Sequence, residues 1–133
     1  HKQITIQNIV PVDTSVFADE RMVEAILRNL LYNALKFTHV GGTVTISSQE
    51  QADAVRISVQ DTGVGISEED IVRLLEPDQS FSTVGTVGEK GTGLGILFCR
   101  ELIEKNGGTL EIESVKHQGS TFSFTLPKPQ APH

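Results

Sequence analysis

Cysteine, positive charge and long apolar runs are all scarce in this sequence, and each shortage excludes a class of protein. Cys99 is the single cysteine among 133 residues, which excludes an internal disulfide framework and a cysteine-rich zinc site. Eleven Lys and Arg against seventeen Asp and Glu leave a formal net charge of −6. This balance argues against nucleic acid as a partner, because phosphate contacts need clustered basic side chains. No apolar run approaches the roughly 18–20 residues of a membrane span, so we expect a small, soluble, acidic domain.

Length and composition predict one domain. Domains commonly contain about 100–150 residues, and a chain that is 38% hydrophobic can bury one core. We expect a single domain over residues 1–133, with its core at about 4–126 and a frayed, proline-containing tail at 127–133. The segment at about 77–90 has no regular pattern, and loops of this length inside a compact domain often act as functional lids.

Hydrophobic spacing predicts helices alternating with strands. A long helix is expected over 20–37 with Asp19 as its N-cap, a short one over 67–75, and a second long one from the glycines at 91–95 to Asn106. Alternating apolar residues predict a half-buried strand at 4–8, a hairpin of 43–49 with 55–60, and a final pair at 109–114 and 120–126. This order predicts an α/β two-layer sandwich, a mixed sheet with helices on one face.

Three polar side chains share one face of the first long helix, because Asn29, Asn33 and Lys36 lie at i, i+4 and i+7. Ile26 on the same face places them at the edge of the buried stripe, where an amide without a partner costs roughly 1–3 kcal/mol. A metal ion with attached phosphates would satisfy them, since an amide oxygen is a hard ligand for Mg²⁺ and Lys supplies a point charge. The alternative is that they bond neighbouring backbone or face water.

Two glycine-containing segments are candidate ligand loops. Asp61, at the end of a predicted strand, precedes Gly63 and Gly65, a pattern typical of a sharp turn with close backbone approach to a ligand. Its carboxylate can accept hydrogen bonds from an exocyclic amine, although an ordinary turn is the alternative. The glycines of the segment 91–95 would let backbone N–H groups converge on a phosphate at a helix N-terminus. This segment matches neither the dinucleotide fingerprint nor a P-loop.

Together, the three segments resemble the N, G1 and G2 boxes of sensor histidine kinases. They are Asn29-Leu30-Leu31-Tyr32-Asn33-Ala34-Leu35-Lys36-Phe37-Thr38, Asp61-Thr62-Gly63-Val64-Gly65-Ile66 and Gly88-Glu89-Lys90-Gly91-Thr92-Gly93-Leu94-Gly95. The resemblance covers about residues 4–126. It implies an ATP-binding catalytic domain of the HATPase_c, GHKL or Bergerat type: a mixed, mostly antiparallel sheet of about five strands, covered on one face by about three helices.

The resemblance also implies a role for each matching residue. Asn33 would coordinate Mg²⁺, Asn29 and Lys36 would act near the phosphates, and Lys90 would reach the γ-phosphate of ATP. Asp61 would bond the adenine 6-amino group. The remaining nucleotide contacts would come from Gly63, Gly65, Ile66, Gly91, Thr92, Gly93, Leu94 and Gly95, with Thr121 at the adenine end.

The residue at position 29 favours a kinase over an ATPase. The related gyrase, Hsp90 and mismatch-repair ATPases hold a Glu four residues before the metal-binding Asn, whereas this chain has Asn29, and an amide cannot act as a general base. None of the four histidines is followed by Glu or Asp, the usual context of a phosphorylated histidine in these kinases. We expect the acceptor on a dimerisation domain of the same parent protein.

The resemblance places this domain in a two-component system, where a response regulator would be an indirect partner. A cytoplasmic location, no direct membrane contact and a monomeric fragment are expected. Two alternatives share the fold: a serine kinase of the anti-sigma type and a non-catalytic ATP-sensing module. Because the net charge is negative, a polyanionic nucleotide must be recognised locally, through Mg²⁺ on Asn33, the ammonium groups of Lys36 and Lys90, and backbone N–H groups.

Overall fold

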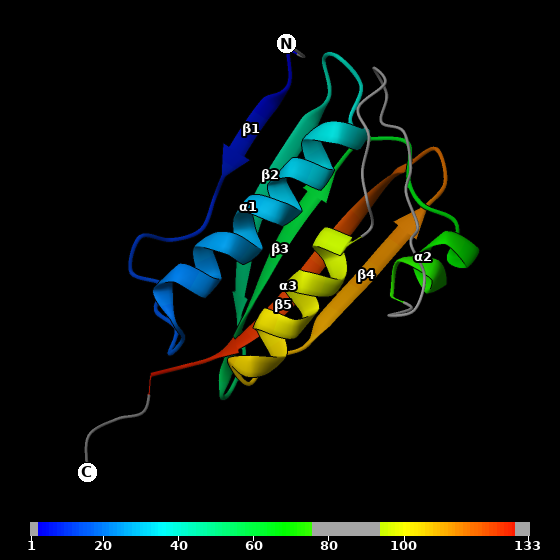
Figure 1. Ribbon diagram of the computed structural model, residues 1–133. Coiled ribbons are helices and arrows are strands. Elements are labelled where there is room, and N and C mark those ends of the chain that lie inside the picture. The colour runs from blue at the N-terminus through cyan, green and yellow to red at the C-terminus, as the bar shows by residue number, and fades with distance from the viewer. Residues whose placement is uncertain (1–2, 76–93, 130–133) are drawn as a thin grey trace.

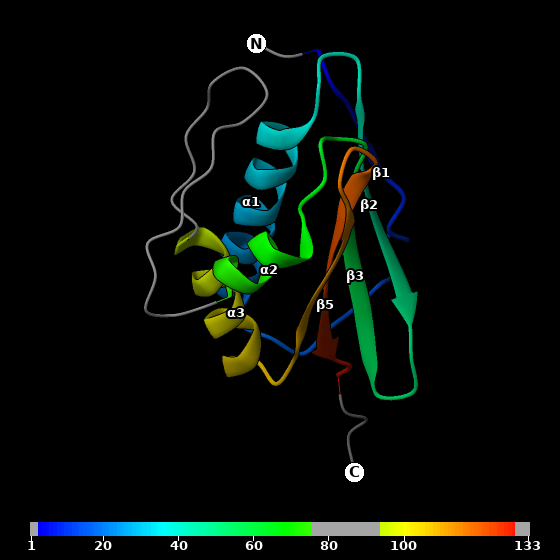
Figure 2. The ribbon, with the colours of Figure 1, turned by 90° about the vertical axis from the view of Figure 1, so that its right-hand side faces the viewer.

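The computed structural model describes residues 3–75 and 94–129. Five strands form one mixed sheet in the order β1-β2-β3-β5-β4, in which β1 runs parallel to β2 and the other neighbours are antiparallel (Figure 1). In chain order the elements are β1 (Thr5–Asn8), α1 (Glu20–Phe37), β2 (Thr43–Glu50), β3 (Ala54–Asp61), α2 (Glu68–Leu74), α3 (Leu94–Lys105), β4 (Leu110–Val115) and β5 (Gly119–Pro127). The three helices of these described residues lie on the same side of the sheet (Figure 2). The predicted fold class is therefore confirmed.

The hydrophobic core lies between α1, α3 and the covered face of the sheet. Alternate residues of the two central strands face it, among them Val59 on β3 and Phe124 on β5, both fully buried. The apolar stripe of α1 packs against them through Ile26 and Leu30, which are also fully buried. None of the described helices is long and apolar enough to span a membrane.

The N-terminus of α1 is capped as the sequence predicts, and the cap also joins two helices. The Asp19 side chain accepts a hydrogen bond from the Met22 N–H at 3.0 Å. The Asp19 N–H itself donates to Asn106 Oδ1 at 2.9 Å, just beyond the end of α3. The start of α1 is thereby tied to the end of α3, as expected for antiparallel neighbours.

Replacing Asp19 by alanine is expected to lower the free energy of unfolding by about 1 kcal/mol, because α1 loses its N-cap acceptor. Asp19→Asn keeps an acceptor oxygen at the same place and serves as the control. Urea denaturation followed by circular dichroism measures both variants. Equal losses in the two variants would contradict the capping role.

Two expectations about the ends of the chain are wrong. The first strand was expected to be half-buried, but all four residues of β1 are exposed, and Ile6 is 52% exposed. The reason is that β1 is an edge strand, whereas α1 packs over β2 and β3. The tail was expected to fray from Pro127, but β5 includes Pro127, and the Lys128 N–H donates to Asp53 O at 2.9 Å. The predicted lid at 77–90 and residues 130–133 lie outside the described residues.

Candidate functional site

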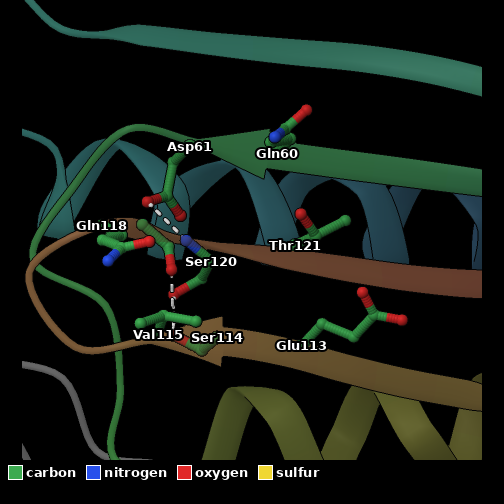
Figure 3. Close-up of a pocket in the computed structure, with 9 residues that line it drawn as sticks. Gln60, Asp61, Glu113, Ser114, Val115, Gln118, Ser120 and Thr121 are labelled. Carbon is green, nitrogen blue, oxygen red and sulfur yellow. Dashed lines mark hydrogen bonds between the residues drawn. The ribbon is translucent and has the colours of Figure 1, made fainter.

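Asp61, the last residue of β3, is a buried carboxylate with one oxygen held in place. It is only 4% exposed, and it pairs in register with Ser120 on β5 (Figure 3). Its Oδ1 atom accepts hydrogen bonds from the Gly63 N–H at 2.9 Å and the Ser120 N–H at 3.3 Å. Two backbone donors from different segments therefore fix the orientation of this carboxylate.

The second oxygen of Asp61 is available to a ligand. Neither of the two hydrogen bonds to the side chain involves Oδ2. Among the described residues there is no buried side-chain oxygen without a partner, so Oδ2 reaches solvent. Burial raises the pKa of the Asp61 carboxyl above its ordinary value, and the two N–H donors oppose that rise. The arrangement suits a ligand that offers an N–H donor to Oδ2.

The loop after Asp61 is joined to the end of α1 by its backbone. The Val64 N–H donates to Phe37 O at 3.0 Å. Gly63 is required at this contact, because a Cβ placed on it would lie 2.1 Å from Phe37 O. This contact brings the helix that carries Asn29, Asn33 and Lys36 next to the Asp61 loop.

The turn between β4 and β5 holds the same loop from the other side. The Ile66 N–H donates to Ser114 Oγ at 2.6 Å, and the His117 N–H donates to Val64 O at 2.5 Å. Gly65 has φ +72°, and a Cβ placed on it would lie 2.1 Å from Val115 O. The loop from Asp61 to Ile66 is therefore packed between α1 and this turn.

The polar face of α1 is positioned as its spacing predicts, at the edge of the buried stripe. Asn29 and Asn33 are partly buried, and Lys36 is only 4% exposed, with its ammonium 4.5 Å from the centre of the Phe37 ring. The Asn29 Nδ2 atom donates to Ala25 O at 2.8 Å. For Asn29, the structure therefore shows the alternative of a bond to neighbouring backbone. The Asn33 side chain makes no hydrogen bond within the part of the chain that the structure describes.

The start of α3 lies against Asn29. A Cβ placed on Gly95 would lie 3.3 Å from Asn29 Oδ1, so glycine allows close approach of the two helices here. Leu94 begins the helix as its first residue. The expected phosphate-binding residues Lys90, Gly91, Thr92 and Gly93 lie outside the described residues.

Thr121 does not lie with Asp61 on the covered face of the sheet. Successive side chains of a strand point to opposite faces, and Ser120 is the residue of β5 that pairs with Asp61. Thr121 and its register partners Gln60 and Glu113 line a hollow of about 200 Å³ at this end of the sheet (Figure 3). Asp61 and Ser120 line the same hollow, so Thr121 stays a candidate at this end of the site.

Ser120, which the sequence analysis missed, is the residue beside the carboxylate. It is 5% exposed, and its N–H contacts Asp61. The period of two in β5 could have identified it. Phe122 and Phe124 are buried, so Ser120 belongs to the same face.

The remaining reactive side chains are placed as the sequence predicts. Cys99 is fully buried in α3, and its Sγ atom lies 3.7 Å from Ile26 O. His39 and His117 are exposed surface residues, while the two terminal histidines lie outside the described residues. None of these groups faces Asp61 as a candidate nucleophile within residues 3–75 and 94–129.

Cys99 is expected to react with a thiol reagent only when the protein unfolds. Burial raises the pKa of its thiol to about 12, so at a pH of about 8 the native protein offers neither the thiolate nor access to it. Labelling with DTNB in native buffer and in urea measures the difference. Rapid labelling of the native protein would contradict this placement.

Comparison with known proteins agrees with this geometry. The model of the family described as histidine kinase-, DNA gyrase B-, and HSP90-like ATPase matches residues 18–130. The chain is 39% identical over 128 residues to the adaptive-response sensory kinase SasA of Rippkaea orientalis, covering 95% of this chain and 32% of that protein. It is 41% identical over 124 residues to the histidine protein kinase DivJ of Caulobacter vibrioides, covering 92% of this chain and 20% of that protein. The chain thus spans a third or less of the length of these relatives.

Solved structures give the same result. The nucleotide-free catalytic domain of histidine kinase ThkA superposes with a TM-score of 0.77 at 32% identity, over 95% of this chain and 80% of that one. Full-length ShkA in complex with AMPPNP superposes with a TM-score of 0.76 at 31% identity, over 98% of this chain and 27% of that one. The chain belongs to the family of histidine kinase-, DNA gyrase B-, and HSP90-like ATPases, and it is an ATP-binding domain of the kind that forms the catalytic domain of sensor histidine kinases.

Proposed function

We propose that this domain binds Mg-ATP and donates the γ-phosphate to a histidine on a separate phosphoacceptor and dimerisation domain of the same parent protein. The observation that carries the proposal is Asp61, a buried carboxylate whose Oδ1 is held by two N–H groups and whose Oδ2 is available. A carboxylate oxygen presented in this way accepts a hydrogen bond from the 6-amino group of adenine, and it would repel the 6-oxo group of guanine.

The residues of α1 fit a magnesium ion and phosphates. Asn33 is a partly buried amide without a hydrogen-bonding partner among the described residues, and Lys36 is a nearly buried cation one helical turn further along the chain. The Asn33 oxygen would hold Mg²⁺, which prefers oxygen ligands, and the Lys36 ammonium would lie close to the phosphates. Bound Mg²⁺ supplies charge neutralisation during phosphoryl transfer. Lys90 and the glycines at 91, 93 and 95 complete the proposed set of phosphate contacts.

The geometry of Asn29 supports transfer to a protein side chain over transfer to water. Its Nδ2 atom is bound to Ala25 O, and its Oδ1 atom points towards Gly95. An amide in this position can orient a group, but it cannot take a proton from water at neutral pH. A histidine acceptor needs no such base, because its imidazole is already a nucleophile. Positioning and charge stabilisation then account for the transfer.

The setting of the domain is part of the same proposal. We take residues 1–133 as one monomeric, cytoplasmic domain that works with a dimerisation domain and, indirectly, with a response regulator. Lys90 is assigned to the γ-phosphate. Lys90→Ala should then weaken both ATP affinity and phosphoryl transfer. If the variant kept the wild-type affinity and transfer rate, the assignment of Lys90 to the γ-phosphate would be wrong.

One transfer experiment tests the proposal. The domain is mixed with γ-labelled ATP, Mg²⁺ and the separately produced dimerisation domain of its parent protein. Acid-labile phosphate on a histidine supports the proposal, while acid-stable phosphate on a serine would instead show a kinase of the anti-sigma type. Binding without transfer would show an ATP-sensing module. Titration with an ATP analogue, with and without Mg²⁺, should show strong Mg²⁺ dependence that Asn33→Ala removes.

A further inference from the structure

We propose that Ser114 is a positioning residue that sets the base preference of the nucleotide site, an inference that rests on the proposed ATP-binding function. Ser114 lies on β4, beyond β5 from Asp61, and none of its hydrogen bonds is to the carboxylate itself. Its hydroxyl is instead the point at which the Asp61 loop, β4 and β5 are bonded together.

Three hydrogen-bonding contacts converge on the Ser114 hydroxyl. Its Oγ atom lies 2.6 Å from the Ile66 N–H, 3.1 Å from Gly119 O and 2.8 Å from Ser120 Oγ. The first contact holds the end of the Asp61 loop. The other two hold Gly119 and Ser120 at the start of β5, where Ser120 pairs with Asp61. In Figure 3, Ser120 lies below Asp61, and Ser114 lies below Ser120 on the neighbouring strand.

The proton count at Ser114 determines the direction of each bond. A hydroxyl has one hydrogen to donate and two lone pairs to accept with. The Ile66 N–H can only donate, and the Gly119 carbonyl can only accept. Ser114 therefore gives its hydrogen to Gly119 O, and Ser120 must give its own hydrogen to Ser114. With all three contacts made, Ser114 has no capacity left.

The consequence for the site is that Ser120 Oγ can only accept. Its hydrogen is committed to Ser114, so its two lone pairs and Asp61 Oδ2 make this end of the sheet a region of acceptors. Acceptors pair with an amino group and not with an oxo group. Without Ser114, the Ser120 hydroxyl could rotate and donate to Asp61 or to an oxo group of a ligand. Ser114 thus keeps the site selective for an amino-purine.

A matched pair of serines elsewhere in the sheet provides the control. Ser58 and Ser123 also lie 2.8 Å apart, Oγ to Oγ, as register partners on β3 and β5. Ser58→Ala removes a serine–serine hydrogen bond of the same length without contacting the Asp61 loop. Ser114→Thr keeps the hydroxyl and is the conservative variant.

The test titrates the whole domain with ATP and with GTP in the presence of Mg²⁺, by calorimetry. S114A is expected to bind ATP about tenfold more weakly, the effect of losing one or two hydrogen bonds, and to lose part of the preference for ATP over GTP. S58A and S114T should keep the wild-type preference. A purely structural role would weaken both nucleotides equally, so an unchanged ATP to GTP ratio in S114A would overturn the proposal.

Hydrogen exchange of the Ile66 amide in the nucleotide-free protein separates this proposal from the proposed function. Loss of the Ser114 acceptor should make this amide exchange at least tenfold faster in S114A, but not in S58A. If the wild-type protein bound no ATP while Ile66 exchange accelerated, the proposed function would fail and the positioning of the loop would stand. Unchanged exchange in S114A would overturn the positioning role even if the protein binds ATP.

Discussion

The D61N variant is expected to bind ATP about 10- to 150-fold more weakly than the wild type, the effect of losing one hydrogen bond to a charged group, without loss of folding stability. The Asn side chain can keep its oxygen at the position of Oδ1, where the Gly63 and Ser120 N–H groups donate. Its NH₂ group then occupies the position of Oδ2. A donor would face the amino group of adenine in place of an acceptor.

Folding stability should move in the opposite direction to affinity. Because burial raises the pKa of Asp61, the ionised carboxylate costs the folded state free energy, and the neutral amide does not. D61N should therefore unfold at the same urea concentration as the wild type, or at a higher one. A variant that lost binding because it had unfolded would contradict this account. D53N, the same change at an exposed turn residue, should alter neither quantity.

The raised pKa of Asp61 also sets the pH dependence. Ionised Asp61 lowers the free energy of unfolding by its full amount above the folded-state pKa of Asp61. Below the ordinary carboxyl pKa this loss is absent, because the group is protonated in both the folded and the unfolded state. The stability gain of D61N over the wild type should thus appear at neutral pH and vanish as the pH falls through that window. Wild-type affinity for ATP should fall over the same window, since a neutral carboxyl accepts more weakly than a carboxylate. The ATP affinity of D61N should not fall over this pH window on account of residue 61, because its amide does not titrate.

The G65A variant is expected to lose roughly 2–5 kcal/mol of folding free energy, from left-handed backbone strain and two broken hydrogen bonds, and to lose ATP binding. Gly65 has φ +72°, and an added Cβ would lie 2.1 Å from the backbone oxygen of Val115. The loop would have to move away from the β4–β5 turn. That movement breaks the bonds of Ile66 to Ser114 and of His117 to Val64.

Gly41 provides the matched control for Gly65. It also has a positive φ, of +86°, but an added Cβ there would have nothing within 4 Å. G41A should therefore cost only the backbone strain, about 1–2 kcal/mol, and should leave ATP affinity unchanged. Urea denaturation and ATP titration of both variants measure the difference. Equal effects at the two glycines would show that the contact with Val115 is unimportant.

Local sequence patterns were sufficient for the helices and for most of the strands. Asp19 and the apolar stripe of α1 lie within one segment, so spacing and capping preferences determine where that helix begins and which face it buries. The three motifs likewise predicted that Asp61 and the polar face of α1 belong to one site. The contact between Val64 and Phe37 joins these two segments directly.

Features that depend on pairing between distant segments could not be predicted in the same way. Ser120 lies beside Asp61 because of the register of β3 with β5, which pairs Thr121 with Gln60 instead. The exposure of β1 depends on where α1 crosses the sheet, and the residues of β1 alone do not predict that position. The role of Ser114 depends on hydrogen bonds to residues five, six and 48 positions away.

Val64 illustrates a kind of constraint that side-chain patterns do not record. The Val64 N–H group donates to the end of α1, and its C=O group accepts from the β4–β5 turn. The main chain of this one residue therefore connects the helix, the loop and the turn. Both bonds are made by the main chain, and any residue with an N–H group can make them. These two bonds therefore restrict the identity of residue 64 only by excluding proline, which has no N–H group, but they fix its position in the chain. An insertion or deletion of one residue in this loop would break the site more completely than most substitutions within it.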